Sequence, residues 1–368
     1  MLYFGTAAFA FGREGWCSRP PQAAGKPYHA SMPTWTTREL LAWTTQHFQE
    51  KAVDSPRVAA EMLLAHVLQT PRLRLYMEPD RPATESERQT FRGLVARAAK
   101  HEPVDYLIGK APFFSLELRV GPDVLVPRPS TETIVEHVLQ SLPLQATQAH
   151  ASADAPPPDE VGNESEQQEP QASGAIEKKP RAFAGRIADV CTGSGAIAVA
   201  LAKHLPEARF VATDASEAAL AVARQNAADH GVADRIDFRQ GHLLEPLGDE
   251  TFDFLLSNPP YIGDAEWANV PPNVKDHEPT LALRGGTDGL DLLRPLVASA
   301  HRHVAPGGQA LLEFSSSQAD AVLALAADNP AWADATILQD HERLPRVLAV
   351  SVLGASSCAA PAAAAQTH

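Results

Sequence analysis

The chain has 368 residues and a formal net charge of −14 at pH 7, so it can bury a sizeable core, and its length predicts two domains. The acidic balance argues against a protein that holds nucleic acid through phosphate contacts, since such proteins present a basic surface. The cysteines Cys17, Cys191 and Cys358 show no paired spacing, which argues against a disulfide framework and a zinc site. We expect a cytoplasmic α/β protein that is not attached to a membrane and holds no metal.

The N-terminal part consists of a segment without periodicity and a helical domain. Residues 1–31 are expected to be disordered or to be a mis-annotated extension, with Met32 as an alternative start of translation. Residues 32–108 predict a helical bundle, whose function is either substrate recognition or stabilisation of the rest of the chain. Its helices are expected to begin with capping residues at Thr36 with Glu39, at Ser55-Pro56 and at Thr84 with Glu87.

The remaining chain contains a connecting segment, an insert and a domain of alternating strands and helices. Residues 109–142 predict a β-hairpin, over the alternating residues 113–126, and a connecting helix. Residues 143–183 are rich in Ala, Pro, Gln and Glu and are expected to be disordered, because few apolar side chains offset the ordering entropy. Residues 184–353 predict a doubly wound, seven-stranded α/β domain, and residues 354–368 a disordered tail. The expected strands are 187–191, 209–213, 236–240, 252–257, 309–314, 336–339 and 347–352, with Pro306-Gly307-Gly308 as the turn into the fifth.

A glycine-rich turn, Thr192-Gly193-Ser194-Gly195, follows the first expected strand and opens a helix. Glycines let the backbone turn sharply and approach a ligand closely, while the helix N-terminus supplies free N–H groups. Asp214, at the end of the next strand, can accept both ribose hydroxyls of a nucleoside cofactor. The acid Asp189 before the turn either contacts the cofactor or caps the turn. The turn alone does not separate NAD from S-adenosylmethionine, because it also satisfies the dinucleotide fingerprint.

The tetrapeptide Asn258-Pro259-Pro260-Tyr261 follows the fourth expected strand and predicts a substrate clamp. Each proline restricts φ and lacks an N–H, so the loop is rigid and rich in acceptors. A planar NH2 group can donate one hydrogen to the Asn258 side-chain oxygen and the other to the Pro259 carbonyl, with Tyr261 over its flat face. The arrangement favours methylation of an amide or amino nitrogen, with Asn258 as the main catalytic residue.

These residues resemble the HemK/PrmC-type glutamine-N5 methyltransferases, which modify the glutamine of the Gly-Gly-Gln motif in peptide-chain release factors. The resemblance covers roughly residues 33–352. It rests on the segments Val124 to Glu132, Asp189 to Ala196, Asp214, Asn258 to Tyr261, His277-Glu278-Pro279, Gly285-Gly286 and Asp288-Gly289.

The resemblance implies a class I S-adenosylmethionine-dependent methyltransferase fold, S-adenosylmethionine as the cofactor, and release factors as the protein substrate of a monomeric enzyme. It implies a catalytic role for Asn258, Pro259, Pro260 and Tyr261. The cofactor-binding residues that it implies are Asp189, Cys191, Thr192, Gly193, Ser194, Gly195, Asp214, Leu243 and Asn258.

The chain also departs from the family pattern, which usually has Gly at Cys191 and an acid at Ser130, and an acidic residue followed by an aromatic at His242-Leu243. The departures affect the adenine pocket. Three alternatives stay open. A ribosomal-protein glutamine methyltransferase uses the same clamp. A DNA or RNA adenine N6-methyltransferase needs a basic groove, which the net charge disfavours. A non-catalytic binding module would have no need of Asn258.

Overall fold

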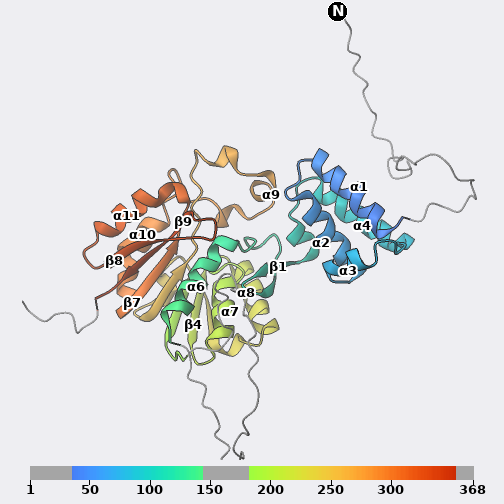
Figure 1. Cartoon of the computed structure of the whole chain (residues 1–368). Helices are drawn as coiled ribbons and strands as arrows, with labels where there is room; N and C mark the ends of the chain where they lie inside the picture. The colour runs from blue at the N-terminus through green and yellow to red at the C-terminus, as the bar shows by residue number, and fades with distance from the viewer. Residues whose placement is uncertain (1–34, 144–181, 354–368) are drawn as a thin grey trace, which may run out of the picture.

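The computed structural model describes residues 35–143 and 182–353. The predicted disordered segments 1–31 and 354–368, the alternative start Met32 and almost all of the predicted insert 143–183 lie outside these residues. The described residues form a small helical domain and a larger domain around one sheet, joined by a short hairpin (Figure 1).

The described part of the N-terminal domain is a helical bundle, as predicted. Its helices are α1 (Thr37–Glu50), α2 (Pro56–Leu68), α3 (Arg72–Met77), α4 (Glu85–Ala98) and α5 (Val104–Ile108). Their apolar side chains meet in one core, where Phe48, Leu64 and Phe91 are buried completely. The sequence did not predict α3 and α5, because helices of 6 and 5 residues are too short to show a period. None of the helices within the described ranges is long and apolar enough to span a membrane.

Capping boxes begin α1 and α4, as the sequence predicts. The Thr84 side chain accepts from the Glu87 N–H while the Glu87 carboxylate accepts from the Thr84 N–H, and Thr36 with Glu39 repeats the pattern. The prediction for Ser55 was wrong in part. Pro56 does take the first helical position, but Ser55 has a left-handed backbone with φ of 43° and makes no side-chain cap, whereas a capping residue normally has extended backbone.

Removing one of these caps should destabilise the helical domain measurably. We expect Thr84→Ala to lower the free energy of unfolding by about 1 kcal/mol, because the Glu87 N–H loses its acceptor. Urea unfolding followed by circular dichroism checks this value. Ser86→Ala is the matched control, since Ser86 is exposed in the first turn of α4, two positions after Thr84. Equal losses of stability in the two variants would contradict the capping role.

The hairpin lies earlier in the chain than predicted. Its strands β1 (Lys110–Phe113) and β2 (Leu116–Arg119) pair antiparallel, and Phe114 and Ser115 form the turn with positive φ angles of 46° and 65°. The alternation that extended the prediction to residue 126 has another cause. Val120, Val124 and Val126 continue beyond the strands and are buried in a small cluster, so their spacing reflects packing rather than strand pairing.

The sheet of the larger domain has the seven strands that the sequence predicts. They are β3 (Arg186–Val190), β4 (Arg209–Asp214), β5 (Ile236–Gln240), β6 (Phe252–Ser257), β7 (Val304–Glu313), β8 (Ala333–Gln339) and β9 (Pro345–Ser351). The order across the sheet is β5-β4-β3-β6-β7-β9-β8, and β9 runs in the direction opposite to that of the other six strands. The chain order reverses between β3 and β6, and in such sheets ligands bind at the carboxyl ends of the strands beside the reversal.

Helices cover both faces of the sheet, which confirms the doubly wound layout (Figure 1). One face carries α6 (Glu132–Ser141), α7 (Ala196–His204) and α8 (Glu217–Asp229), and the other carries α10 (Leu293–Ser299) and α11 (Ala319–Ala327). A short helix, α9 (Pro272–Lys275), lies in the long loop after β6. One detail differs from expectation: Pro306-Gly307-Gly308 lies inside β7, where the register with β6 shifts, and is not a turn before the strand.

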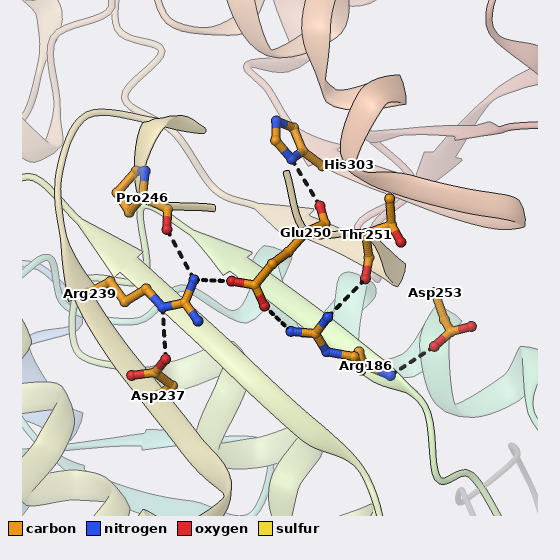
Figure 2. A network of polar contacts seen from close by, with 8 residues as sticks. All are labelled: Arg186, Asp237, Arg239, Pro246, Glu250, Thr251, Asp253 and His303. Atoms are coloured by element: carbon orange, nitrogen blue, oxygen red, sulfur yellow. Dashed lines mark hydrogen bonds and ion pairs between the residues drawn. The ribbon is translucent and has the colours of Figure 1, made fainter. Parts of the chain in front are cut away.

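A network of charged side chains connects Arg186 at the start of β3, Glu250 just before β6 and Arg239 in β5 (Figure 2). The Glu250 carboxylate pairs with Arg239 and with Arg186, and hydrogen bonds from Arg239 and Arg186 lower its pKa. His303 Nδ1 lies 3.1 Å from the Glu250 carbonyl oxygen. None of these residues lines the cavity described below, and the network links three strands of the sheet.

Candidate active site

A cavity opens at the carboxyl ends of the parallel strands, where the chain order reverses. Its walls come from the loops after β3, β4, β5 and β6, from residues 123–131 ahead of α6, and from residues 279–282 in the loop after β6. Leu281 is 65% exposed and lies along this cavity with Pro279 and Ala282, so part of the wall is apolar. No group of three or more His, Cys, Asp or Glu within the described ranges is arranged to hold a metal ion.

Most of the residues that the sequence singled out meet at this one cavity, although they come from distant parts of the chain. Those that line it are Cys191, Thr192, Gly193, Ser194, Asp214, Leu243, Asn258 and Pro260. The cavity wall does not include Asp189, Gly195, Pro259 and Tyr261. Asp189 lies in β3, and the other three adjoin cavity-lining residues in the chain.

Asp189 braces the glycine turn from inside the protein. It is fully buried, and its Oδ2 accepts hydrogen bonds from Thr192 Oγ1 at 2.6 Å and from the Ala198 N–H at 3.2 Å. Burial raises the pKa of Asp189 to about 7, and these two hydrogen bonds oppose the rise. The geometry therefore agrees with the second interpretation of Asp189, a carboxylate that caps the turn.

The glycines of the turn have left-handed backbone, with φ of +55° at Gly193 and +79° at Gly195. A Cβ on Gly195 would also lie 3.1 Å from Ala223 Cβ in α8, so this glycine is needed for close packing. A Cβ on Gly193 would meet no atom within 4 Å, and Gly193 lines the cavity. The turn thus brings backbone to the cavity at Gly193 and anchors itself at Gly195.

Asp214 connects two of the loops that form the cavity. Its Oδ2 accepts from the Gly193 N–H and its Oδ1 from the Ser216 N–H, both at 2.9 Å. Burial raises the pKa of Asp214, while these backbone hydrogen bonds lower it. A carboxylate held in this way at a strand end keeps lone pairs available for hydroxyl groups of a ligand.

Cys191 stands in a backbone conformation that explains why glycine is usual there. Its φ is +60°, and a side chain in the left-handed region costs roughly 1–2 kcal/mol. Burial raises the pKa of the Cys191 thiol to about 12, so the thiol stays protonated near neutral pH. Leu243, across the same cavity, also has a positive φ of 46°.

Substitutions at Cys191 should separate backbone strain from packing. We expect Cys191→Gly to change the free energy of unfolding by less than about 1 kcal/mol, since relief of strain offsets the added freedom of the unfolded chain. Cys191→Val should lower it by at least about 2 kcal/mol, because β-branched residues avoid positive φ. Thermal unfolding of both variants, with Cys191→Ala as the packing control, provides the comparison, and equal stability of Gly and Val variants would contradict it.

Two hydrogen bonds hold Asn258 at the cavity, one made by the residue before it and one by its own side chain. In the strand before it, Ser257 Oγ donates to the Val190 carbonyl at 2.7 Å and ties the ends of β6 and β3 together. The half-buried Asn258 side chain then donates from Nδ2 to Thr131 Oγ1 at 2.9 Å. Within the described ranges no hydrogen bond to Asn258 Oδ1 is formed, so this oxygen is available as an acceptor.

The residues that follow Asn258 are fixed by burial and by a hydrogen bond. Pro259 and Pro260 are buried, and the Tyr261 carbonyl accepts from Gln318 Nε2 at 2.9 Å, which fixes the loop to the segment after β7. Burial raises the pKa of the Tyr261 phenol, so it remains protonated. The loop is therefore rigid on both sides of the amide.

The structure adds two buried carboxylates to which the sequence reasoning gave no role, although it named Glu278 among the segments of the family resemblance. Glu313, at the end of β7, is fully buried and accepts from Ser130 Oγ at 3.1 Å. Glu278, also buried, accepts from Arg128 at 2.6 Å. The signal for Glu313 was present, because a carboxylate that ends a buried apolar strand is the same pattern that identified Asp214.

The loop after β6 also contacts the helical domain. His277 Nε2 lies 3.3 Å from the Lys100 carbonyl oxygen, next to the buried Glu278. A cleft between the domains is lined by residues of both, including Val53, His101, Arg128 and Val274. Arg128 lines this cleft and the cavity with Asn258, so the two openings adjoin.

Comparison with known proteins identifies the family of this arrangement. The family model for the PrmC N-terminal domain matches residues 39–109, and that for the methyltransferase small domain matches residues 174–270. A release factor glutamine methyltransferase of Geobacter sulfurreducens is 38% identical over 314 residues, which cover 85% of this chain and 96% of that protein. Proteins of the same name from Rhodopirellula baltica and Chlorobaculum tepidum are 35% and 37% identical, over 84% and 85% of this chain and 95% and 96% of their own lengths. The chain therefore belongs to the release factor glutamine methyltransferase family.

Proposed function

We propose that this protein transfers a methyl group from S-adenosylmethionine to the side-chain nitrogen of the glutamine in the Gly-Gly-Gln motif of peptide-chain release factors. The observation that carries the proposal is the placement of Asn258. Its amide N–H is engaged by Thr131, and its oxygen remains available in the cavity that Gly193 and Asp214 also line. Family membership supports the same reaction.

The residues at the cavity fit S-adenosylmethionine. Gly193 allows close approach of a ligand to the backbone, and Asp214 offers a carboxylate to ribose hydroxyls. Apolar side chains of Leu243, Ile197 and Leu292 line the same space. When bound, S-adenosylmethionine supplies a methyl group that is activated by the positive charge of its sulfonium.

The chain's own residues would prepare the substrate nitrogen. An amide nitrogen is a weak nucleophile because its lone pair is delocalised into the carbonyl. Two acceptors, Asn258 Oδ1 and the Pro259 carbonyl, would hold its two N–H bonds, orient the nitrogen and favour the positive charge that develops on it. Positioning and electrostatics then carry the rate, without a strong base acting before methyl transfer. Tyr261, which does not line the cavity itself, would pack beside the clamp, and burial raises the pKa of its phenol.

Methyl transfer from labelled S-adenosylmethionine tests the proposal. The substrates are a release factor, its Gly-Gly-Gln variant with alanine in place of glutamine, a glutamine-bearing ribosomal protein and DNA. We expect label in the release factor alone, and none in its alanine variant. Label in the ribosomal protein or in DNA would redirect the proposal to one of the two alternative substrates, of which DNA is disfavoured by the net charge of −14.

A further inference from the structure

The loop after β6 presents an exposed apolar side chain at the cavity. Leu281 is 65% exposed and lies in a turn of 3-10 helix, Thr280–Ala282, that forms part of the cavity wall. Among the described residues that line the cavity, Leu281 is the only large apolar side chain that is exposed. A single exposed leucine on a protein surface is ordinary, but at the wall of a ligand cavity it offers apolar area that a bound molecule can cover.

The turn that carries Leu281 is fastened to the loop of the clamp. The Ile262 N–H donates to the Leu283 carbonyl, and the Gly285 N–H donates to the Ile262 carbonyl, both at 2.9 Å. A Cβ on Gly285 would lie 2.8 Å from the Pro260 carbonyl oxygen, so the two segments pack closely. Because Ile262 directly follows the clamp in the chain, these contacts fix the turn relative to it.

A second set of contacts fastens the same turn to the segment ahead of α6. Glu278, three residues before Leu281, pairs with Arg128 at 2.6 Å and accepts from the Val126 N–H at 3.4 Å. The side chain of Glu278 is only 1% exposed, so water does not compete for this pair at the carboxylate. The turn is therefore held from two sides, and a fixed backbone presents the Leu281 side chain.

The proposed cofactor and substrate belong to different strands of the sheet. Gly193 and Asp214, which suit S-adenosylmethionine, follow β3 and lie at the end of β4. Leu281 lies in the loop after β6, as Asn258 does, and β6 is on the side of β3 opposite to β4. The exposed area of Leu281 is therefore on the side of the clamp, where the polypeptide substrate binds in the proposed reaction.

We infer that Leu281 is a specificity-determining residue, which packs against the main chain beside the substrate glutamine and favours glycine there. The amide nitrogen has to reach Asn258, so the residues that flank the glutamine stay at the opening of the cavity, where Leu281 is exposed. Glycine has no Cβ and lets an apolar wall approach its backbone, whereas a larger side chain would collide with the braced turn. This inference rests on the proposed function, because it takes the Gly-Gly-Gln segment as the substrate.

Truncation of Leu281 tests the contact. We expect Leu281→Ala to raise the KM for the release factor by about tenfold, with kcat and the Kd for S-adenosylmethionine changed by less than about threefold. Leu281→Met keeps the side-chain volume and should retain the KM within about threefold. Leu353→Ala is the matched control, because Leu353 is 62% exposed and does not line the cavity. A KM equal to that of the control, or a raised Kd for S-adenosylmethionine in place of a raised KM, would overturn the inference.

Release factors in which one glycine of the motif is changed to alanine test the preference for glycine. For the glycine that meets Leu281, we expect the wild-type kcat/KM to fall by about a hundredfold. In Leu281→Ala the same change should cost about tenfold or less, because the shorter side chain leaves room for the added methyl group. Leu353→Ala should discriminate as the wild type does. Equal discrimination by the wild type and Leu281→Ala at both glycines would contradict the assigned role.

A binding measurement separates this inference from the proposed function. The release factor with alanine in place of the motif glutamine lacks the methylated group, so calorimetry gives its Kd without turnover. We expect Leu281→Ala to raise this Kd by about tenfold and Leu353→Ala to leave it unchanged. If the wild type binds the release factor but methylates none, the proposed function fails while this Kd still decides the contact. An equal Kd for wild type and Leu281→Ala would refute the contact, and a wild type that binds no release factor would refute both.

Discussion

Replacing Asn258 with alanine is expected to lower kcat for methyl transfer by about 10²–10³-fold, the usual effect of removing one fixed hydrogen-bond partner from a reaction centre. The variant loses both the side-chain oxygen of Asn258 and the hydrogen bond from its Nδ2 to Thr131. The substrate amide would keep only the Pro259 carbonyl, and its nitrogen would be free to rotate away from the methyl group. Single-turnover rates with saturating substrates measure this loss without interference from product release.

Binding of S-adenosylmethionine should change much less in the same variant. Asn258 is one of several residues at the cavity wall, and the glycine turn with Asp214 remains intact. We expect the Kd measured by calorimetry to rise by less than about tenfold. Asn269→Ala serves as the control, since Asn269 is exposed in the loop after β6. A variant at Asn258 with near-normal turnover would remove the clamp from the mechanism.

Replacing Asp214 with alanine should mainly weaken cofactor binding, whereas replacing Asn258 should mainly lower kcat. A carboxylate that accepts two ribose hydroxyls makes two charge-assisted hydrogen bonds, and their loss should raise the Kd for S-adenosylmethionine by about a hundredfold or more. The Gly193 and Ser216 N–H groups would also lose their acceptor, which loosens the turn. Calorimetric titration of the folded variant measures the change.

Asp214→Asn and a surface control make this test specific. The asparagine keeps one acceptor oxygen, so its Kd should lie between those of wild type and Asp214→Ala. Asp249→Ala removes an equal charge from an exposed position at the other end of the strands and should leave the Kd unchanged. If the Kd of Asp214→Ala matched that of the Asp249 control, the ribose assignment would be wrong.

The sequence predicted the sheet well because its strands carry a local signal. The predicted strands correspond to β3 through β9, since buried apolar runs between turn residues depend on few long-range contacts. The capping boxes at Thr36 and Thr84 were equally local and are confirmed. The errors lie where local pattern and packing diverge: the alternation up to residue 126 reflects burial in a side cluster, and Ser55 has a backbone that does not suit a cap.

The candidate site was predictable in its parts, because each motif ends a strand and parallel strands place their carboxyl ends together. Sequence reasoning therefore placed Gly193, Asp214 and Asn258 at one edge before their contacts were known. It left two roles for Asp189, and the structure shows the carboxylate behind the turn, bonded to Thr192 and Ala198. Whether a side chain is buried depends on all the elements packed around it, so a single motif cannot predict it.

The order of residues along the chain by itself determined which elements form and which loops end at the cavity, because propensity, capping and apolar runs act over a few neighbouring positions. Only the tertiary structure decided which residue holds the Asn258 side chain. Its Nδ2 donates to Thr131, which is 127 positions away in the chain and meets Asn258 only when β6 and the segment before α6 pack together. A hydrogen bond acts over about 3 Å, and folding alone brings such distant residues within that reach.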